Sequence, residues 1–94
     1  MQIAWHRRAR QDLQAVRGYI AEVNPGAARQ VAQRILQAVR LLAEQPGLGR
    51  PGRVPETREL VITGTPYIAV YRVVDDTIVI LWVLHGARQW PERL

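Results

Sequence analysis

The stretch that most restricts the fold of this chain is residues 77–84, where eight successive residues carry no charge. Isoleucine, valine, leucine and tryptophan follow one another there without polar alternation, so both faces of a strand formed by them are apolar. A strand of this kind lies inside a sheet and has other elements covering each face. The sequence therefore predicts a layered domain with residues 77–84 as a central strand.

Two amphipathic helices precede this strand. After a short expected strand at residues 2–5, apolar residues recur at steps of four and three, which defines one face of a helix. Asn24 and Pro25 then end this helix and begin the next, with Asn24 as the expected N-cap. Such a short connection predicts an antiparallel helical hairpin. The first stripe comprises Ala9, Leu13, Val16, Ile20 and Val23, and the second, over residues 25–44, comprises Ala28, Val31, Ile35, Val39 and Leu42.

The second half of the chain is typical of a sheet. Residues 58–63 and 67–74 read as strands, and Asp75 with Asp76 makes a short connection to the central strand. Residues 46–56 contain three prolines and three glycines in close succession and read as an exposed loop. The predicted order is β-α-α-β-β-β, an α+β fold with the hairpin packed on a mostly antiparallel sheet. Residues 1–94 are expected to form a single domain.

The composition excludes several kinds of chemistry. The chain has no cysteine, serine, lysine or phenylalanine, so disulfides, cysteine-bound zinc and serine or cysteine nucleophiles are absent. His6 and His85 lie far apart in the sequence and belong to no metal-binding motif. Residues 47–54 resemble a phosphate-binding loop in spacing, but have Arg53 and Val54 where that loop needs lysine and a hydroxyl residue. We therefore expect neither a metal nor a cofactor.

The charge of the chain is concentrated in its first part. Residues 1–58 carry ten arginines and four acids, whereas residues 59–94 carry three arginines and four acids. A basic surface of this kind favours nucleic acid or an acidic protein as partner, although helix-surface arginines also serve solubility alone. No secretion signal or membrane-spanning stretch is indicated, so a cytoplasmic location is expected.

Arg72 is the first candidate for a functional side chain. Strict alternation along residues 67–74 places Arg72 among Ile68, Val70 and Val74, and an arginine in apolar surroundings needs a carboxylate or phosphate partner. The partner is either a bound molecule or Glu59 on the adjacent strand. The sequence leaves both interpretations open.

A second group of candidates follows the central strand. His85, Arg88 and Trp90 lie within six residues, and they are suited to RNA as proton donor or acceptor, phosphate ligand and base-stacking plate respectively. RNA cleavage needs no serine or cysteine, because the ribose 2′-hydroxyl is the nucleophile. The alternative is structural, with His85 hydrogen-bonded at a strand end and Trp90 covering the core.

Four segments together resemble the RelE/ParE superfamily of toxins from bacterial toxin–antitoxin modules. The resemblance covers nearly the whole chain and is closer to the ParE side. It implies a growth-inhibiting toxin that a small acidic antitoxin neutralises. The segments are ARQDLQAVRGYI, LLAEQPGLGRPG, RELVITGTPYIAVYRV and VLHGARQWP.

The resemblance implies one of two targets. ParE-like members inhibit DNA gyrase without known hydrolytic chemistry, whereas RelE-like members cut messenger RNA on the ribosome. For cleavage, Arg72, His85 and Arg88 match the catalytic residues in kind. The catalytic lysines of RelE have no counterpart, so proton transfer depends on His85. A nucleic-acid-binding module without toxicity is a third, less favoured class.

The sequence also predicts two binding surfaces. The basic loop and its neighbours are expected to contact the target. An antitoxin segment that folds on binding is expected to dock on the first helix and the strand before it. The target-binding residues are Arg50, Arg53, Arg58 and Trp90, and the antitoxin-binding residues are Trp5, Leu13, Val16 and Ile20.

Overall fold

The computed structural model describes residues 1–86 and Trp90, and it confirms the predicted α+β fold. The two-residue strand β2 corrects the prediction that residues 46–56 form loop throughout. Helix α2 ends three residues before Glu44, the predicted end. The elements are β1 (Gln2–Trp5), α1 (Arg7–Ala21), α2 (Pro25–Leu41), β2 (Arg50–Pro51), β3 (Arg58–Val61), β4 (Tyr67–Val74) and β5 (Thr77–His85).

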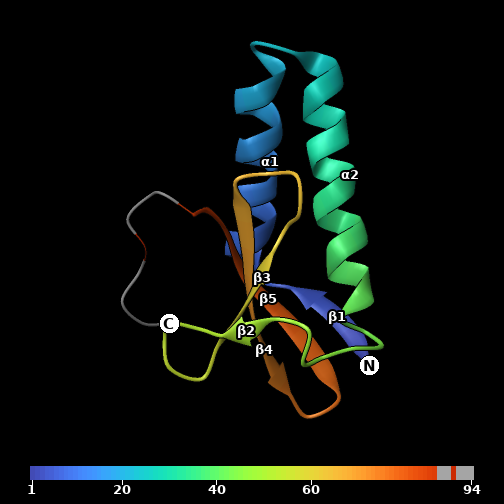
Figure 1. Cartoon of the computed structure of the whole chain (residues 1–94), viewed down its shortest axis with the longest axis vertical. Coiled ribbons are helices and arrows are strands. Elements are labelled where there is room, and N and C mark those ends of the chain that lie inside the picture. The colour runs from blue at the N-terminus through green and yellow to red at the C-terminus, as the bar shows by residue number, and fades with distance from the viewer. Residues whose placement is uncertain (87–89, 91–94) are drawn as a thin grey trace.

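The two helices form the predicted antiparallel hairpin, which leans on one face of the sheet and extends past it (Figure 1). Asn24 caps α2, since its Oδ1 accepts a hydrogen bond of 3.1 Å from the Ala27 N–H. His6 caps α1 in the same way through Nδ1 and the Arg8 N–H. Val23 is 86% exposed in the connection, so the apolar stripe of α1 ends before it.

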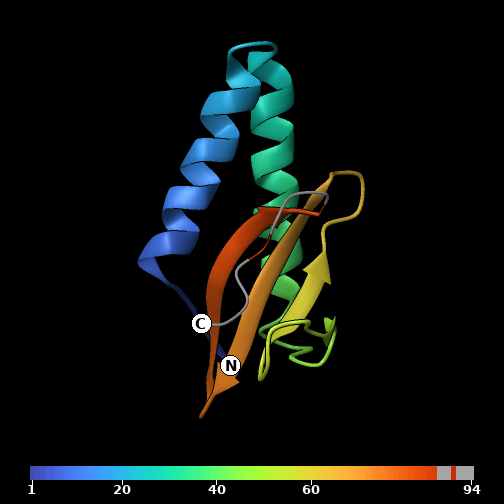
Figure 2. The same ribbon diagram turned by 90° about the vertical axis from the view of Figure 1, so that its left-hand side faces the viewer.

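The sheet has the strand order β1-β5-β4-β3-β2. Strand β1 pairs with β5 in parallel, and the other neighbours are antiparallel. Strand β5 thus has a neighbour on each side, as its uncharged sequence predicts. Figure 2 shows the hairpin on one side of this sheet and the segment that carries β2 at its lower edge.

Each face of the sheet carries its own apolar cluster. The larger cluster lies between the sheet and the helices and contains Ile35, Tyr71 and Ile80, all fully buried. The smaller cluster lies on the opposite face, where Val54 and Trp90 pack on residues of β4 and β5. The two faces are called here the helix face and the open face. Both faces of β5 are covered, which explains why its sequence shows no alternation.

A β-bulge changes the direction of the side chains near the end of β5. Tyr71 pairs with Ile80 and Val70 pairs with Trp82, so Leu81 is an extra residue in β5. Leu81 and Trp82 both belong to the open-face cluster, and Val83 returns to the helix-face cluster. The bulge therefore places His85, two residues beyond Val83, on the helix face.

Candidate binding surfaces

Glu59 on β3 organises the basic segment around β2. Its side chain is 2% exposed, and a carboxylate so deeply buried requires cationic partners. Arg50 donates to Oε1 from Nε and Nη2, at 3.3 and 3.0 Å. Arg53 donates to Oε2 from its backbone N–H at 2.8 Å and from Nε at 3.1 Å, and to Oε1 from Nη2 at 3.3 Å. Both arginine side chains remain about half exposed, at 54% and 47%.

Trp90 extends this arrangement on the open face. The guanidinium of Arg53 lies 3.6 Å from the centroid of the Trp90 ring, a cation–π contact. The Trp90 Nε1–H donates to the His85 carbonyl at 3.2 Å, which fixes the ring. Glu59, Arg50, Arg53 and Trp90 are called the Glu59 cluster below. Three of the four residues predicted to bind the target are therefore neighbours in space.

Arg58, the fourth predicted target-binding residue, has a structural contact next to this cluster. Its Nη1 donates to the Gly49 carbonyl at 2.8 Å. Tyr71 holds the same segment from inside the protein, since its hydroxyl donates to the Pro46 carbonyl at 2.7 Å and accepts from the Gly49 N–H at 2.9 Å. A Cβ on Gly49 would lie 2.7 Å from the Tyr71 hydroxyl, so only glycine fits there. These contacts fix the backbone that leads into Arg50.

The pKa of the Glu59 carboxyl lies below its usual value of 4.5. Burial raises this pKa, but hydrogen bonds from Arg53 and Arg50 and the charge of Arg53 outweigh the effect of burial. Because the pKa is lower in the folded state, the carboxylate contributes stability above about pH 4.5, and that stability is lost as the pH falls through the folded-state pKa. Urea unfolding at pH 3 to 7 should show a loss of stability below pH 4.5 that is smaller in Glu59→Gln. Equal acid slopes in the two proteins would exclude this role for Glu59.

The structure does not bring Arg72 and His85 together, which corrects the prediction of a shared site. Tyr67 pairs with His85 in the register, and Arg72 lies five positions further along β4, paired with Val79. An odd separation places Arg72 and Tyr67 on opposite faces, and five residues span roughly 17 Å. One scissile phosphate cannot contact both side chains. Arg88 lies outside the described residues.

His85 instead lies at the helix face, next to α1. Its ring meets that of Tyr67 edge to face, with centroids 5.6 Å apart and planes at 84°. Asp12, Tyr67 and His85 line one hollow beside α1. The Asp12 Oδ2 accepts from the Val83 N–H at 3.0 Å, and its Oδ1 pairs with Arg8 at 3.0 Å. The surroundings of His85 are therefore aromatic and acidic, with Arg72 on the other face.

The Arg72–Glu59 pair that the sequence leaves open is absent from the structure. Both carboxylate oxygens of Glu59 bind Arg50 and Arg53. The guanidinium Nε of Arg72 is buried and has no hydrogen-bond partner among the described residues. The charge of Arg72 is thus left for something other than Glu59.

The predicted antitoxin-binding stripe on α1 is largely part of the core. Val16 is only 8% exposed, so its selection as an anchor is wrong, because it faces the sheet. Trp5, Leu13 and Ile20 are partly buried and pack against the helix-face cluster. Little apolar surface is left on this stripe for a partner.

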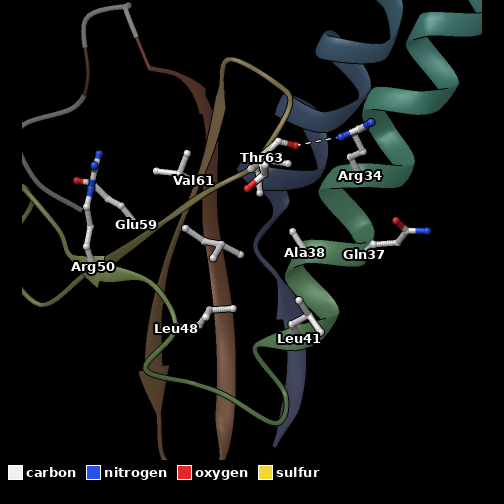
Figure 3. Close-up of a pocket in the computed structure, with 11 residues that line it drawn as sticks. Arg34, Gln37, Ala38, Leu41, Leu48, Arg50, Glu59, Val61 and Thr63 are labelled. Atoms are coloured by element: carbon white, nitrogen blue, oxygen red, sulfur yellow. Dashed lines mark hydrogen bonds and ion pairs between the residues drawn. The ribbon is translucent and has the colours of Figure 1, made fainter.

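Exposed apolar residues gather instead between α2 and β3 (Figure 3). Leu41, Leu48 and Val61 are 51%, 44% and 50% exposed, and they line a groove of about 660 Å³. Arg34 lies on the α2 side, with its Nη1 3.4 Å from the Thr63 carbonyl, and Arg50 of the Glu59 cluster lies at the opposite rim. This α2–β3 groove is an apolar surface flanked by two cations, and periodicity did not predict it.

Among residues 1–86 and Trp90, no group of three or more histidine or acidic side chains could hold a metal ion. Within the same residues, no helix is long and apolar enough to span a membrane.

Residues 3–90 match the model of a family described as the ParE toxin of the type II toxin–antitoxin system, parDE. The chain belongs to this ParE toxin family. The relatives of this ParE-family toxin include the "Putative toxin Y4kP" of Sinorhizobium fredii, 47% identical over 92 residues that cover 98% of the chain and 95% of the relative. They also include "Toxin RelE2" of Caulobacter vibrioides, 40% identical over 87 residues, or 93% of the chain and 97% of the relative.

Solved structures place the fold in the same family. A chain of the chromosomal ParDE toxin–antitoxin system from P. aeruginosa matches with a TM-score of 0.81 and 32% identity, over 88% of this ParE-family toxin and 92% of that chain. A chain of the RelBE2 toxin–antitoxin complex from Mycobacterium tuberculosis matches with a TM-score of 0.63 and 23% identity, over 89% and 95%. The second likeness shows the fold alone. The expected membership of the RelE/ParE superfamily, on the ParE side, is confirmed.

Proposed function

We propose that this toxin inhibits growth by binding DNA gyrase through the Glu59 cluster and that a cognate antitoxin neutralises it. The observation that carries the proposal is the buried Glu59 carboxylate, which holds the half-exposed side chains of Arg50 and Arg53 side by side. Arginines held in this way lose little conformational freedom on binding, and they present planar donors to an acidic surface. Gyrase is a cytoplasmic enzyme, so the proposal also places the toxin in the cytoplasm.

Binding is favoured over cleavage by the positions of the titratable residues. A nuclease of the RelE type needs a proton donor or acceptor and phosphate-binding cations around one phosphate. His85 and Arg72 lie on opposite faces of the sheet, and the chain has no lysine. Messenger RNA cleavage remains the alternative, because one relative is called RelE2.

The antitoxin is proposed to dock in the α2–β3 groove. Leu41, Leu48 and Val61 offer apolar surface, and Arg34 and Arg50 at the rims favour an acidic segment. A segment that is disordered alone and folds on binding suits a groove of this kind. This docking site replaces the stripe on α1, where Val16 is buried.

The gyrase proposal is tested with Arg50→Ala in a plasmid supercoiling assay. Loss of one exposed guanidinium from a binding centre is expected to raise the toxin concentration for half-inhibition about tenfold. The variant should fold, because Glu59 keeps its hydrogen bonds to the backbone and side chain of Arg53. Arg29→Ala is the matched control, since Arg29 is an exposed arginine on α2.

Two results would contradict this proposal. Equal losses in Arg50→Ala and Arg29→Ala would show that only the overall positive charge matters. Codon-phased cuts in messenger RNA after expression in bacteria, with supercoiling unaffected, would instead establish the RelE-like activity.

A further inference from the structure

Arg72 has one buried N–H donor that no described residue accepts. Its side chain is only partly exposed, and its Nε–H is buried without an acceptor. Buried polar groups in folded proteins are almost always hydrogen-bonded, and a guanidinium left without an acceptor is destabilising. Such a group therefore indicates a partner outside the described residues.

Thr57, Glu56 and Glu59 carry side-chain oxygens, and none of them accepts a hydrogen bond from the Arg72 Nε–H. Thr57, just before β3, donates its hydroxyl proton to the Val54 carbonyl at 2.7 Å and accepts no hydrogen bond from the Arg72 Nε–H. Glu56 and Arg72 line a common hollow, which is described next, but no hydrogen bond or ion pair joins the two side chains. The oxygens of Glu59 bind Arg50 and Arg53, as described above.

The hollow beside Arg72 has the size and charge for one small anionic group. It measures about 310 Å³ and is lined by Pro51, Glu56, Thr57, Arg58, Arg72 and Val73. The Arg58 guanidinium is held at its other contact, the Gly49 carbonyl, which uses only one of its five N–H donors. Arg58 and Arg72 thus both line one hollow, and the Arg72 Nε–H has no acceptor among the described residues.

The negative charge of Glu56 at the hollow distinguishes between possible anions. A nucleic-acid backbone brings several phosphate charges close together, and the Glu56 carboxylate repels each of them. A single carboxylate is compensated by Arg58 and Arg72, whose planar donors match its two oxygens. The hollow also follows the α2–β3 groove along β3, because Glu59 lines the groove and Arg58 lines the hollow.

We propose that Arg72 and Arg58 form a subsite for one carboxylate of an acidic segment in a protein partner. The subsite rests on the proposed function in one respect, namely that the toxin has an acidic protein partner. It does not depend on gyrase being the target. The test below uses the isolated toxin, so this subsite and the gyrase proposal succeed or fail separately.

The test follows the Nε–H signal of Arg72 by NMR in the ¹⁵N-labelled full-length chain. Tetraglutamate is expected to shift this signal in a saturable way, whereas tetraglutamine at the same concentration leaves it in place. Arg72→Lys keeps the charge but loses the planar donors, so the affinity for tetraglutamate should fall about tenfold. Arg10→Lys, at an exposed position of α1, should bind tetraglutamate as the unmodified chain does.

Three results would overturn the proposal. An oligothymidylate that shifts the Arg72 signal at lower concentration than tetraglutamate would make nucleic acid the occupant. Equal affinities in the unmodified chain and in folded Arg72→Lys, checked by circular dichroism, would remove Arg72 from the site. A shift of the same signal by Glu92→Gln alone, with no response to tetraglutamate, would assign the acceptor to this chain itself.

Discussion

Glu59→Ala is expected to lower the free energy of unfolding by about 3 kcal/mol, because breaking a buried ion pair leaves its partners uncompensated. The Arg53 backbone N–H loses its acceptor, and a side chain that is 2% exposed is replaced by a smaller one. The arginines remain about half exposed and keep part of their hydration, which limits the effect to the low end of the range for buried pairs.

Urea denaturation at pH 7 measures this change. Glu44→Ala is the matched control, since Glu44 is exposed and an exposed substitution changes stability by about 0.5 kcal/mol or less. Glu59→Gln should be intermediate, because the amide keeps the shape and one acceptor oxygen. If Glu59→Ala is as stable as Glu44→Ala, Glu59 does not organise the basic segment.

The same substitution separates stability from target binding. Folded Glu59→Gln no longer holds Arg50 and Arg53 through two carboxylate oxygens. We therefore expect gyrase inhibition to fall about tenfold, the effect of losing one central contact in a binding interface. Inhibition by Glu59→Gln that equals that of the unmodified toxin would show that the cluster is structural only.

The helical hairpin and the strand order could be predicted because their signals are local. The stripe on α2 repeats every three to four residues, and Asn24 with Pro25 marks the boundary in two adjacent positions. The uncharged strand 77–84 indicates burial on both faces without any tertiary information. These features depend on residues close together in the chain.

The Glu59 cluster depends on residues that only the fold brings together. Arg50 and Glu59 are paired through β2, a strand of two residues with no periodicity to detect. The sequence indicates Arg50 and Arg53 by their position in a basic loop, and it leaves Glu59 as one of two partners for Arg72. The sequence does show a carboxylate in a strand of apolar residues. Such a carboxylate requires a cationic partner, but the sequence does not indicate which arginine that is.

The side-chain directions at the end of β5 illustrate a second limit. Strict alternation from Ile78 would place His85 on the open face, the face of Arg72. The bulge at Leu81 reverses this assignment, and an all-apolar strand gives no polar residue that reports the change. The shared site that the resemblance implies for Arg72 and His85 is therefore contradicted twice, by this change of face and by the five positions that separate the two residues along the β4–β5 pair.

The largest expected effect on partner binding comes from the double substitution Leu41→Asp and Val61→Asp. Both side chains are about half exposed in the α2–β3 groove, so a docked acidic segment would bury their remaining apolar surface. Aspartates there remove this contribution and repel the acidic partner, and we expect the affinity for the cognate antitoxin to fall at least about 100-fold. Titration calorimetry measures the affinity, and loss of growth rescue on co-expression is the cellular readout.

Two control variants make this result specific to the groove. Val23→Asp adds the same charge at an 86% exposed residue in the helix connection, and it should leave antitoxin affinity unchanged. Tyr19→Asp probes the hollow on α1 beside Val16 and Ile20, near the surface that the sequence predicts. Because the groove residues are about half exposed, the double variant should still fold. Antitoxin binding that is lost in Tyr19→Asp but retained in the double variant would return the docking site to α1.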